Sequence, residues 1–293
     1  MISFLKRQKN LLLGLLSIVV LLVGYDWLSR RQHRINPEDT TIPSWSQLRE
    51  GVKTSFGEHP RSGERWVVVD SKATATRLFL GLSLGVLGAI VLGLCMGCIE
   101  AVEAFFLPPL SLLAKVPPTA ALAVFFVLVG TDTEMYATMI AFGVLPILAQ
   151  SVYLAVKEVP EELKYKAYTL GASHIEVLWD VIVRHIFPKV LDAIRLQIGP
   201  AMVYLIAAEM VVGDVGFGYR IRLQARLLNM NVVYPYLVLL ALAGFALDWI
   251  LRVIQRVTCP WYGGETSGLA LAIGGLYRFI RNCTTPSPAK ENR

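Results

Sequence analysis

Long runs without a charged residue constrain this chain more than any other feature of its sequence. Residues 78–99 contain no Asp, Glu, Lys or Arg, and the same holds for residues 135–156 and 227–247. The hydrocarbon core of a bilayer is about 30 Å thick, and a helix of about 20 apolar residues crosses it. Each of the three runs is therefore predicted to be a membrane-spanning helix.

Three further segments are also expected to cross the membrane. Residues 11–28 follow three basic residues, but their apolar core is longer than that of a signal peptide and no A-x-A cleavage site follows. We interpret them as an uncleaved anchor. Residues 116–131 and 196–213 complete a predicted set of six spanning helices.

Composition agrees with a membrane protein and disfavours several other classes. Of the 293 residues, 55% are hydrophobic and 17% are charged, which disfavours a soluble enzyme and a disordered chain. The net charge is +6, but the basic residues flank apolar runs, so we expect no nucleic-acid partner. The sequence contains no G-x-x-x-x-G-K-[ST], G-x-S-x-G or H-E-x-x-H motif, so we expect no catalytic site.

Cysteine and glycine patterns point to packing rather than to chemistry. Four cysteines are too few for a disulfide framework in a chain of this length. Cys95 and Cys98 form a C-x-x-C inside a predicted spanning helix, where small apolar filler is a better interpretation than a zinc or redox site. The same helix has glycines at 81, 85, 88, 93 and 97, a spacing that lets another helix approach closely.

The orientation in the membrane is only weakly encoded by charge. With the N-terminus inside, six spans place 15 Lys and Arg residues on the inner side and 12 on the outer side, with Lys115 as the remaining one of 28. The positive-inside rule then slightly favours cytoplasmic N- and C-termini. Residues 29–72 are predicted to be extracytoplasmic, and residues 159–188 cytoplasmic.

Residues 159–195 have the signals of two helices joined by a turn. Pro160 is expected at the first helical position, and Glu161 and Glu162 favour the positive end of the helix dipole. Gly171 is expected to end this helix, and Ser173 and Glu176 form the S-x-x-E capping box of the next one, which Pro188 is expected to end. Such an amphipathic hairpin either docks a soluble partner or packs only on its own bundle.

Glu209 lies inside a predicted spanning helix. A carboxylate there is a functional-site hypothesis by default; the alternative is a residue near the helix end that bonds to a neighbouring helix or to water.

The hairpin sequence KYKAYTLGASHIEVLWDVIVRHIFPKVLDAIR resembles the EAA loop of ABC importer permeases. Ala167, Gly171 and Pro188 match the last alanine, the glycine and a proline of that loop, whereas Tyr165, Lys166 and Arg184 depart from it. The segments KVPPTAALAVFFVLVG, VLPILAQSVYLAVKEVPEEL and AAEMVVGDVGFGY resemble the nitrate, sulfonate, taurine and bicarbonate subfamily. The resemblance covers about residues 76–256.

The resemblance implies an all-α membrane protein with the small type I importer transmembrane fold and six spanning helices. It implies a multi-pass permease of the cytoplasmic (inner) membrane that carries a small anion, pairs as a homodimer, and works with ABC ATPase subunits and an extracytoplasmic solute-binding protein. ATP and Mg²⁺ would bind the ATPase, and no cofactor is expected in this chain. The ATPase-coupling residues implied are Glu161, Glu162, Tyr165, Lys166, Ala167, Gly171, Ala172 and Pro188. For such a permease, the predicted translocation pathway contains Pro146, Gln150, Gln197 and Glu209.

The domain organisation that follows has four parts. Residues 1–28 form the anchor helix, 29–72 the extracytoplasmic segment, 73–256 the transmembrane domain, and 257–293 an inner tail with an interfacial helix at 266–277 and disorder from 284 onward. Two other classes stay open from the residues alone. A secondary transporter or channel would need no ATPase, and a non-transporting scaffold would leave the hairpin without a role.

Overall fold

The computed structural model describes residues 2–36, 39–58 and 63–262, and the side chains in these ranges except those of residues 2–12 and 15. The described part is helical, with one isolated antiparallel bridge between Glu58 and Arg65 and no strand. The helices are α1 (Ile2–Ile35), α2 (Trp45–Phe56), α3 (Trp66–Cys98), α4 (Glu100–Leu113), α5 (Leu122–Val129), α6 (Thr133–Lys157), α7 (Glu161–Thr169), α8 (His174–Glu176), the π-helical stretch η1 (Val177–Val183), α9 (Arg184–Val212), α10 (Phe217–Arg226) and α11 (Met230–Thr258).

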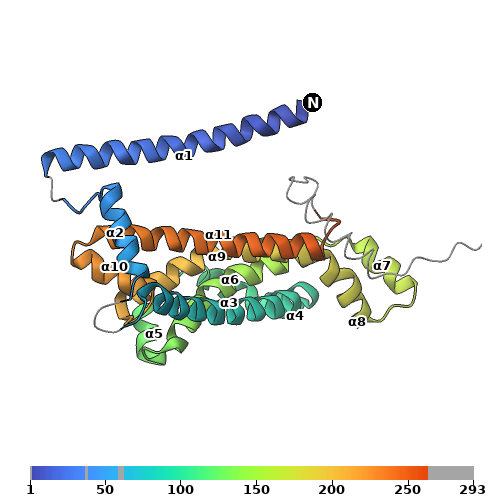
Figure 1. Cartoon of the computed structure of the whole chain (residues 1–293). Helices are drawn as coiled ribbons and strands as arrows, with labels where there is room; N and C mark the ends of the chain where they lie inside the picture. Colours follow the sequence, from blue (N-terminus) through green and yellow to red (C-terminus); the bar gives the residue numbers. More distant parts are fainter. Residues whose placement is uncertain (1, 37–38, 59–62, 263–293) are drawn as a thin grey trace, which may run out of the picture.

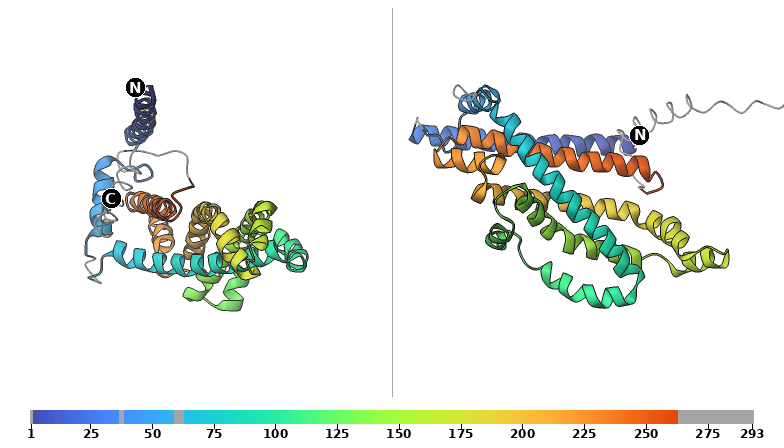
Figure 2. Two further views of the ribbon diagram at one scale, coloured as in Figure 1. Left: turned by 90° about the vertical axis from the view of Figure 1, so that its right-hand side faces the viewer. Right: turned by 90° about the horizontal axis from the view of Figure 1, so that it is seen from below.

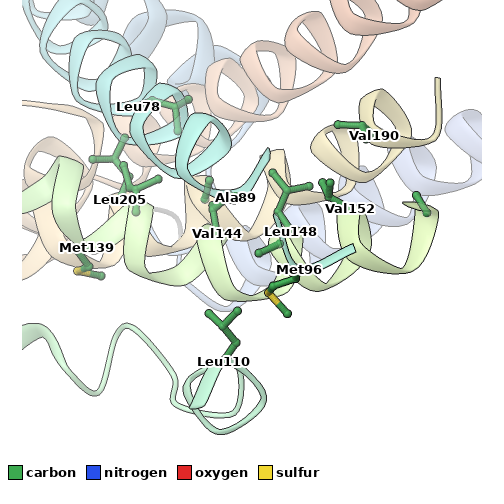
Figure 3. Packing of buried hydrophobic residues seen from close by; sticks show 14 of the residues in the cluster. Leu78, Ala89, Met96, Leu110, Met139, Val144, Leu148, Val152, Val190 and Leu205 are labelled. Atoms are coloured by element: carbon green, nitrogen blue, oxygen red, sulfur yellow. The ribbon is translucent and has the colours of Figure 1, made fainter. Parts of the chain in front are cut away.

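The core of the bundle lies between α3, α6 and α9, and its centre is the contact of α3 with α6 (Figure 3). The glycines of α3 make this contact possible. A Cβ at Gly81 would collide with Ile140, and one at Gly93 or Gly97 would collide with Val152 or Val156. The close packing predicted from the glycine spacing is confirmed, and α6 is the partner helix.

Four helices within the described ranges are long and apolar enough to cross a membrane. They are α3, α6, the continuous helix from His174 to Val212, and α11. The anchor predicted at residues 11–28 lies inside α1, which is one helix from Ile2 to Ile35. Figure 1 shows α1 running alongside the bundle, joined to it through the segment before α2.

The spanning helix predicted over residues 116–131 is wrong. α4 ends at Leu113 and α5 has only eight residues, with a non-helical stretch at 114–121 between them. Pro117 and Pro118 have no N–H, so the Leu113 and Ala114 carbonyls have no helical donor at the point where α4 ends. The chain therefore returns across the bundle as two short helices.

Pro188 does not end the second helix of the hairpin, contrary to the prediction. α8, η1 and α9 form one continuous helix from His174 to Val212, and Pro188 lies buried inside α9. The wider turns of η1 end at Val183, directly before Arg184, whose carbonyl would accept the helical hydrogen bond from the N–H that Pro188 lacks. The π-helical turns thus precede the proline without breaking the helix, and the hairpin is directly attached to a spanning helix.

The two ends of the bundle differ in construction (Figures 1 and 2). α7 and α8 project from one end, whereas α2, α5 and α10 gather at the other. At that second end α2 packs on the start of α11 so closely that Gly51 lies against the Asn231 carbonyl. The predicted interfacial helix at 266–277 and the tail from 284 lie outside the described residues.

Candidate docking and transport sites

The hairpin at the projecting end consists of α7, the turn after it, α8 and η1. Pro160 is the N-cap of α7 rather than its first helical residue, one position earlier in the helix than predicted. Glu161 and Glu162 lie in the first turn, next to the positive end of the helix dipole. At the membrane-proximal base, the Lys189 ammonium lies 2.7 Å from the Glu158 carboxylate and lowers the pKa of Glu158.

The turn of the hairpin has the geometry that its sequence predicts. Gly171 has φ of +86°, in the left-handed region that favours glycine, and it follows the last turn of α7. Ser173 caps the next helix by accepting a hydrogen bond from the Glu176 N–H, and the Glu176 carboxylate accepts one from the Ser173 N–H at 2.7 Å. The capping box is confirmed, and it starts the second arm of the hairpin two residues after Gly171.

The hairpin exposes apolar side chains that the bundle does not cover. No residue of α7 is buried. Leu170 is 88% exposed, and Ile175 and Trp179 are 70% and 61% exposed. A groove of about 370 Å³ runs between the end of α7 and η1, lined by Ala167, Leu170, Gly171, Ala172, Glu176, Val177, Asp180 and Val181. The exposed apolar side chains favour docking of a partner over a hairpin that packs only on its own bundle.

The structure gathers seven of the eight predicted coupling residues and separates the eighth. Glu161, Glu162, Tyr165, Lys166, Ala167, Gly171 and Ala172 all lie on α7 or the turn after it. Pro188 is buried in α9, where its carbonyl accepts a hydrogen bond of 2.9 Å from the Gln255 side chain of α11. Pro188 therefore joins two helices of the bundle instead of facing outward.

A buried polar cluster lies at the opposite end, around Glu209. The Glu209 carboxylate is 0% exposed, and the Arg77 guanidinium lies 2.9 Å from it. Thr74 donates to the same carboxylate at 2.9 Å, and the Gly218 N–H donates at 2.9 Å. Arg77 also stacks on the Tyr136 ring at 4.1 Å. The predicted alternative of a bond to a neighbouring helix is the arrangement observed.

A second ion pair extends this cluster to α10 and α11. Asp70 of α3 is fully buried and pairs with Arg220 at 2.8 Å. Its carboxylate also accepts hydrogen bonds from the Tyr236 hydroxyl at 2.8 Å and the Gly216 N–H at 3.0 Å. Gly216 has φ of +119°, and a Cβ there would collide with the Glu209 carboxylate. Two carboxylates and two guanidinium groups thus tie four helices together without net charge.

None of Asp70, Thr74 and Arg77 is predicted from the sequence to belong to a site. The uncharged run places the start of the spanning helix at residue 78, whereas α3 begins twelve residues earlier, at Trp66. The spacing of 70, 74 and 77 puts the three side chains on one helix face, and Gly81 and Gly85 continue that face. This polar and small-residue stripe is the signal that could have identified them.

The remaining predicted pathway residues lie apart from the cluster. Pro146 and Gln150 are one turn apart in α6, and the Gln150 amide donates to the carbonyls of Pro146 and Leu110. Gln197 is buried in α9 and its Oε1 has no hydrogen-bond partner within the described residues. Gln197 lies twelve residues before Glu209, about 18 Å along the helix axis. The structure therefore does not bring the four residues into one site.

Comparison with known proteins supplies the family. Residues 78–258 match the family described as "Binding-protein-dependent transport system inner membrane component". The taurine transport system permease protein TauC of Escherichia coli is 29% identical over 260 residues, which are 88% of this chain and 92% of TauC. The nitrate import permease protein NrtB of Synechocystis is 22% identical over 190 residues, 64% of this chain and 68% of NrtB.

A solved structure shows the same fold. The chain aligns with one chain of the MetNI methionine ABC transporter in an inward-facing conformation, with a TM-score of 0.53 and 19% identity. The alignment covers 66% of this chain and 94% of that one. The fold expected from the sequence resemblance is thereby confirmed. From the family match over most of the spanning region, this chain belongs to the binding-protein-dependent transport system inner membrane components, the permeases of ABC importers.

Proposed function

We propose that this chain is the permease subunit of an ATP-driven importer for small sulfonates or nitrate-like anions. The relatives support this solute class by their names: TauC for taurine, SsuC of Bacillus subtilis for aliphatic sulfonates, and NrtB for nitrate. Taurine, aliphatic sulfonates and nitrate all carry a negative charge spread over oxygen atoms bonded to one sulfur or nitrogen.

The observation that carries the proposal is the exposed apolar hairpin at the end of a continuous helix. The chain has no phosphate-binding loop, so the ATPase is a separate subunit, and α7 with its uncovered Leu170 is the surface that it binds. When the ATPase closes on ATP, the displacement of α7 passes across the turn at Gly171 into α8, and from α8 it passes through η1 into α9 along one continuous helix.

Two further partners complete the proposed transporter. A solute-binding protein docks at the end where α2 and α10 gather, since this end faces away from the ATPase (Figure 1). A second copy of this chain pairs with it, so that the solute path runs between two permeases. This arrangement places the hairpin in the cytoplasm and α2 outside the membrane.

Cysteine labelling in intact cells tests the orientation. Starting from a variant without Cys95, Cys98, Cys259 and Cys283, we expect Glu58→Cys to react with an impermeant thiol reagent. Glu162→Cys should react only after the cells are opened. The opposite pattern would contradict the orientation, and with it the placement of the ATPase on the hairpin.

Co-purification tests the function itself. The affinity-tagged chain, extracted in mild detergent, should carry an ATPase subunit in stoichiometric amounts. A secondary transporter or channel would purify without one. Binding-protein-dependent uptake of taurine or nitrate that stops when ATP is removed completes the test.

A further inference from the structure

The break between α4 and α5 lies near the middle of the bundle. Gln150 of α6 donates to the Leu110 carbonyl of α4 at 3.3 Å, seven residues before the hairpin end of α6. Pro118 lies against Gly143, fourteen residues before that end. With a rise of 1.5 Å per residue, the chain between Leu110 and Pro118 sits about 10 to 21 Å inside the bundle from the hairpin end.

Lys115 lies within this break. It is exposed on the surface of the single chain, and within the described residues no carboxylate pairs with it. Arg77 and Arg195 of the spanning helices differ from it, because Arg77 pairs with Glu209 and Arg195 pairs with Asp248, each at 2.9 Å. Lys115 is thus an unpaired cation at membrane depth.

Neither the charge nor the backbone at this position suits a lipid surface. An unpaired ammonium at membrane depth is costly, and a lysine side chain of about 6 Å is too short to reach the headgroups from the middle of this range. Irregular backbone at this depth occurs where other protein covers it or where it lines a water-filled cavity. The Ala114 carbonyl also needs protein or water beside it, because its helical donor would be the N–H that Pro118 lacks.

The neighbouring surface has room for a small solute. A groove of about 540 Å³ lies between α5 and the end of α9, lined by Thr119, Ala120, Leu122, Ala123, Phe126, Val211 and Val212. It begins four residues beyond Lys115 along the chain. Binding pockets for small molecules combine such apolar walls with a few polar groups that fix the ligand.

We infer that Lys115 binds the anionic group of the solute during transport, facing the space between this chain and a second copy. This inference rests on the proposed function, because it takes from it the anion and the permease pair. Each copy contributes one Lys115, so the path presents two cations at mid-depth. The ammonium donates hydrogen bonds to sulfonate or nitrate oxygens and offsets the loss of their hydration.

Uptake by the complete transporter in proteoliposomes tests this role, with taurine and nitrate as the solutes. Lys115→Met should lower uptake at limiting solute by about tenfold or more, since a charge-assisted hydrogen bond is lost. Lys115→Arg keeps the charge and should retain most of the uptake. Arg256→Met, which removes an exposed arginine from the last turn of α11, is the matched control and should transport normally.

A structural role would give a different pattern. Membrane abundance and the bound ATPase should be unchanged in Lys115→Met, so the loss appears as a raised KM rather than as missing protein. Normal uptake by Lys115→Met of a solute that the wild type carries overturns the inference and leaves the proposed function standing. If the wild type carries neither taurine nor nitrate, the proposed solute class and this inference fall together.

Thiol labelling distinguishes a solute path from a lipid contact. In the cysteine-free variant, Lys115→Cys should react with an anionic, water-soluble thiosulfonate, and saturating taurine or nitrate should slow the reaction. A thiol that resists the reagent in the assembled transporter faces lipid or tightly packed protein, and this result contradicts the inference.

Discussion

The two ends of this permease treat apolar and charged side chains in opposite ways. The hairpin end leaves Leu170, Ile175 and Trp179 exposed, whereas the other end buries the carboxylates of Asp70 and Glu209. Exposing apolar side chains to water costs free energy, and a partner protein that covers them removes this cost. Buried carboxylates are tolerated only when they are paired. The hairpin end therefore has an apolar surface that another protein can cover, whereas the buried carboxylates of the cluster end are paired within the chain.

One helix connects these contrasting ends. The helix from His174 to Val212 has 39 residues and starts in the hairpin, and Glu209 lies in its last turn. At 1.5 Å per residue it is about 58 Å long. Because Glu209 and Arg77 hold its far end to α3, a displacement of the hairpin acts against a fixed point. We therefore expect mutations in the cluster to lower stability and mutations in the hairpin to lower coupling.

The largest effect is expected from breaking the cluster. Glu209→Leu leaves the buried Arg77 without its partner and should destabilise the bundle by about 3–5 kcal/mol, seen as lost membrane abundance and a lower Tm in detergent. Asp214→Asn is the matched control. Asp214 is 93% exposed and its carboxylate lies 3.8 Å from the Arg77 guanidinium, a long distance for an ion pair, so this substitution should leave stability unchanged. Glu209→Gln keeps the shape and should assemble. Normal abundance and Tm of Glu209→Leu would show that the ion pair does not hold this end together.

A smaller free-energy change at the hairpin should have a specific effect on coupling. At Gly171 an added side chain meets no atom within 4 Å, so Gly171→Val acts only through the backbone, at about 1–2 kcal/mol of strain. Membrane abundance should stay near normal while uptake and the stimulation of ATP hydrolysis by loaded binding protein fall sharply.

Two variants sharpen the Gly171 test. Gly171→Asn should retain uptake, because asparagine tolerates positive φ. Gly63→Val places the same strain at a glycine with φ of +67° far from the hairpin, and it should transport normally. Wild-type uptake by Gly171→Val at matched expression would refute a coupling role for this turn.

The smallest effect is expected at the capping box. Ser173→Ala removes the side-chain acceptor of the Glu176 N–H and should weaken the start of the second arm by about 1 kcal/mol. Hydrogen exchange should rise in residues 173–178 and not around Glu209. Ser173→Asp restores a capping oxygen and should reverse the change. Equal exchange in all three proteins would mean that packing, rather than the cap, stabilises the start of the second arm.

Local signals in the sequence predicted the elements whose physics is local. The uncharged runs identified α3, α6 and α11, and the glycine spacing identified the face of α3 that another helix covers. The positive φ of Gly171 and the capping box of Ser173 also depend only on near neighbours in the chain. Family resemblance added the fold, which hydropathy alone did not specify.

Only the tertiary structure decided where charged and proline residues lie within the bundle. A hydropathy reading ends a span at the first charged residue, yet Arg77 lies inside α3 because Glu209, 132 positions away, neutralises it. Pro188 lies inside a continuous helix, where π-helical turns precede it and the Gln255 side chain of α11 donates to its carbonyl. The depth of Lys115 likewise depends on contacts of its flanking residues with α6. Each of these outcomes depends on a partner far away in sequence, which no local pattern encodes.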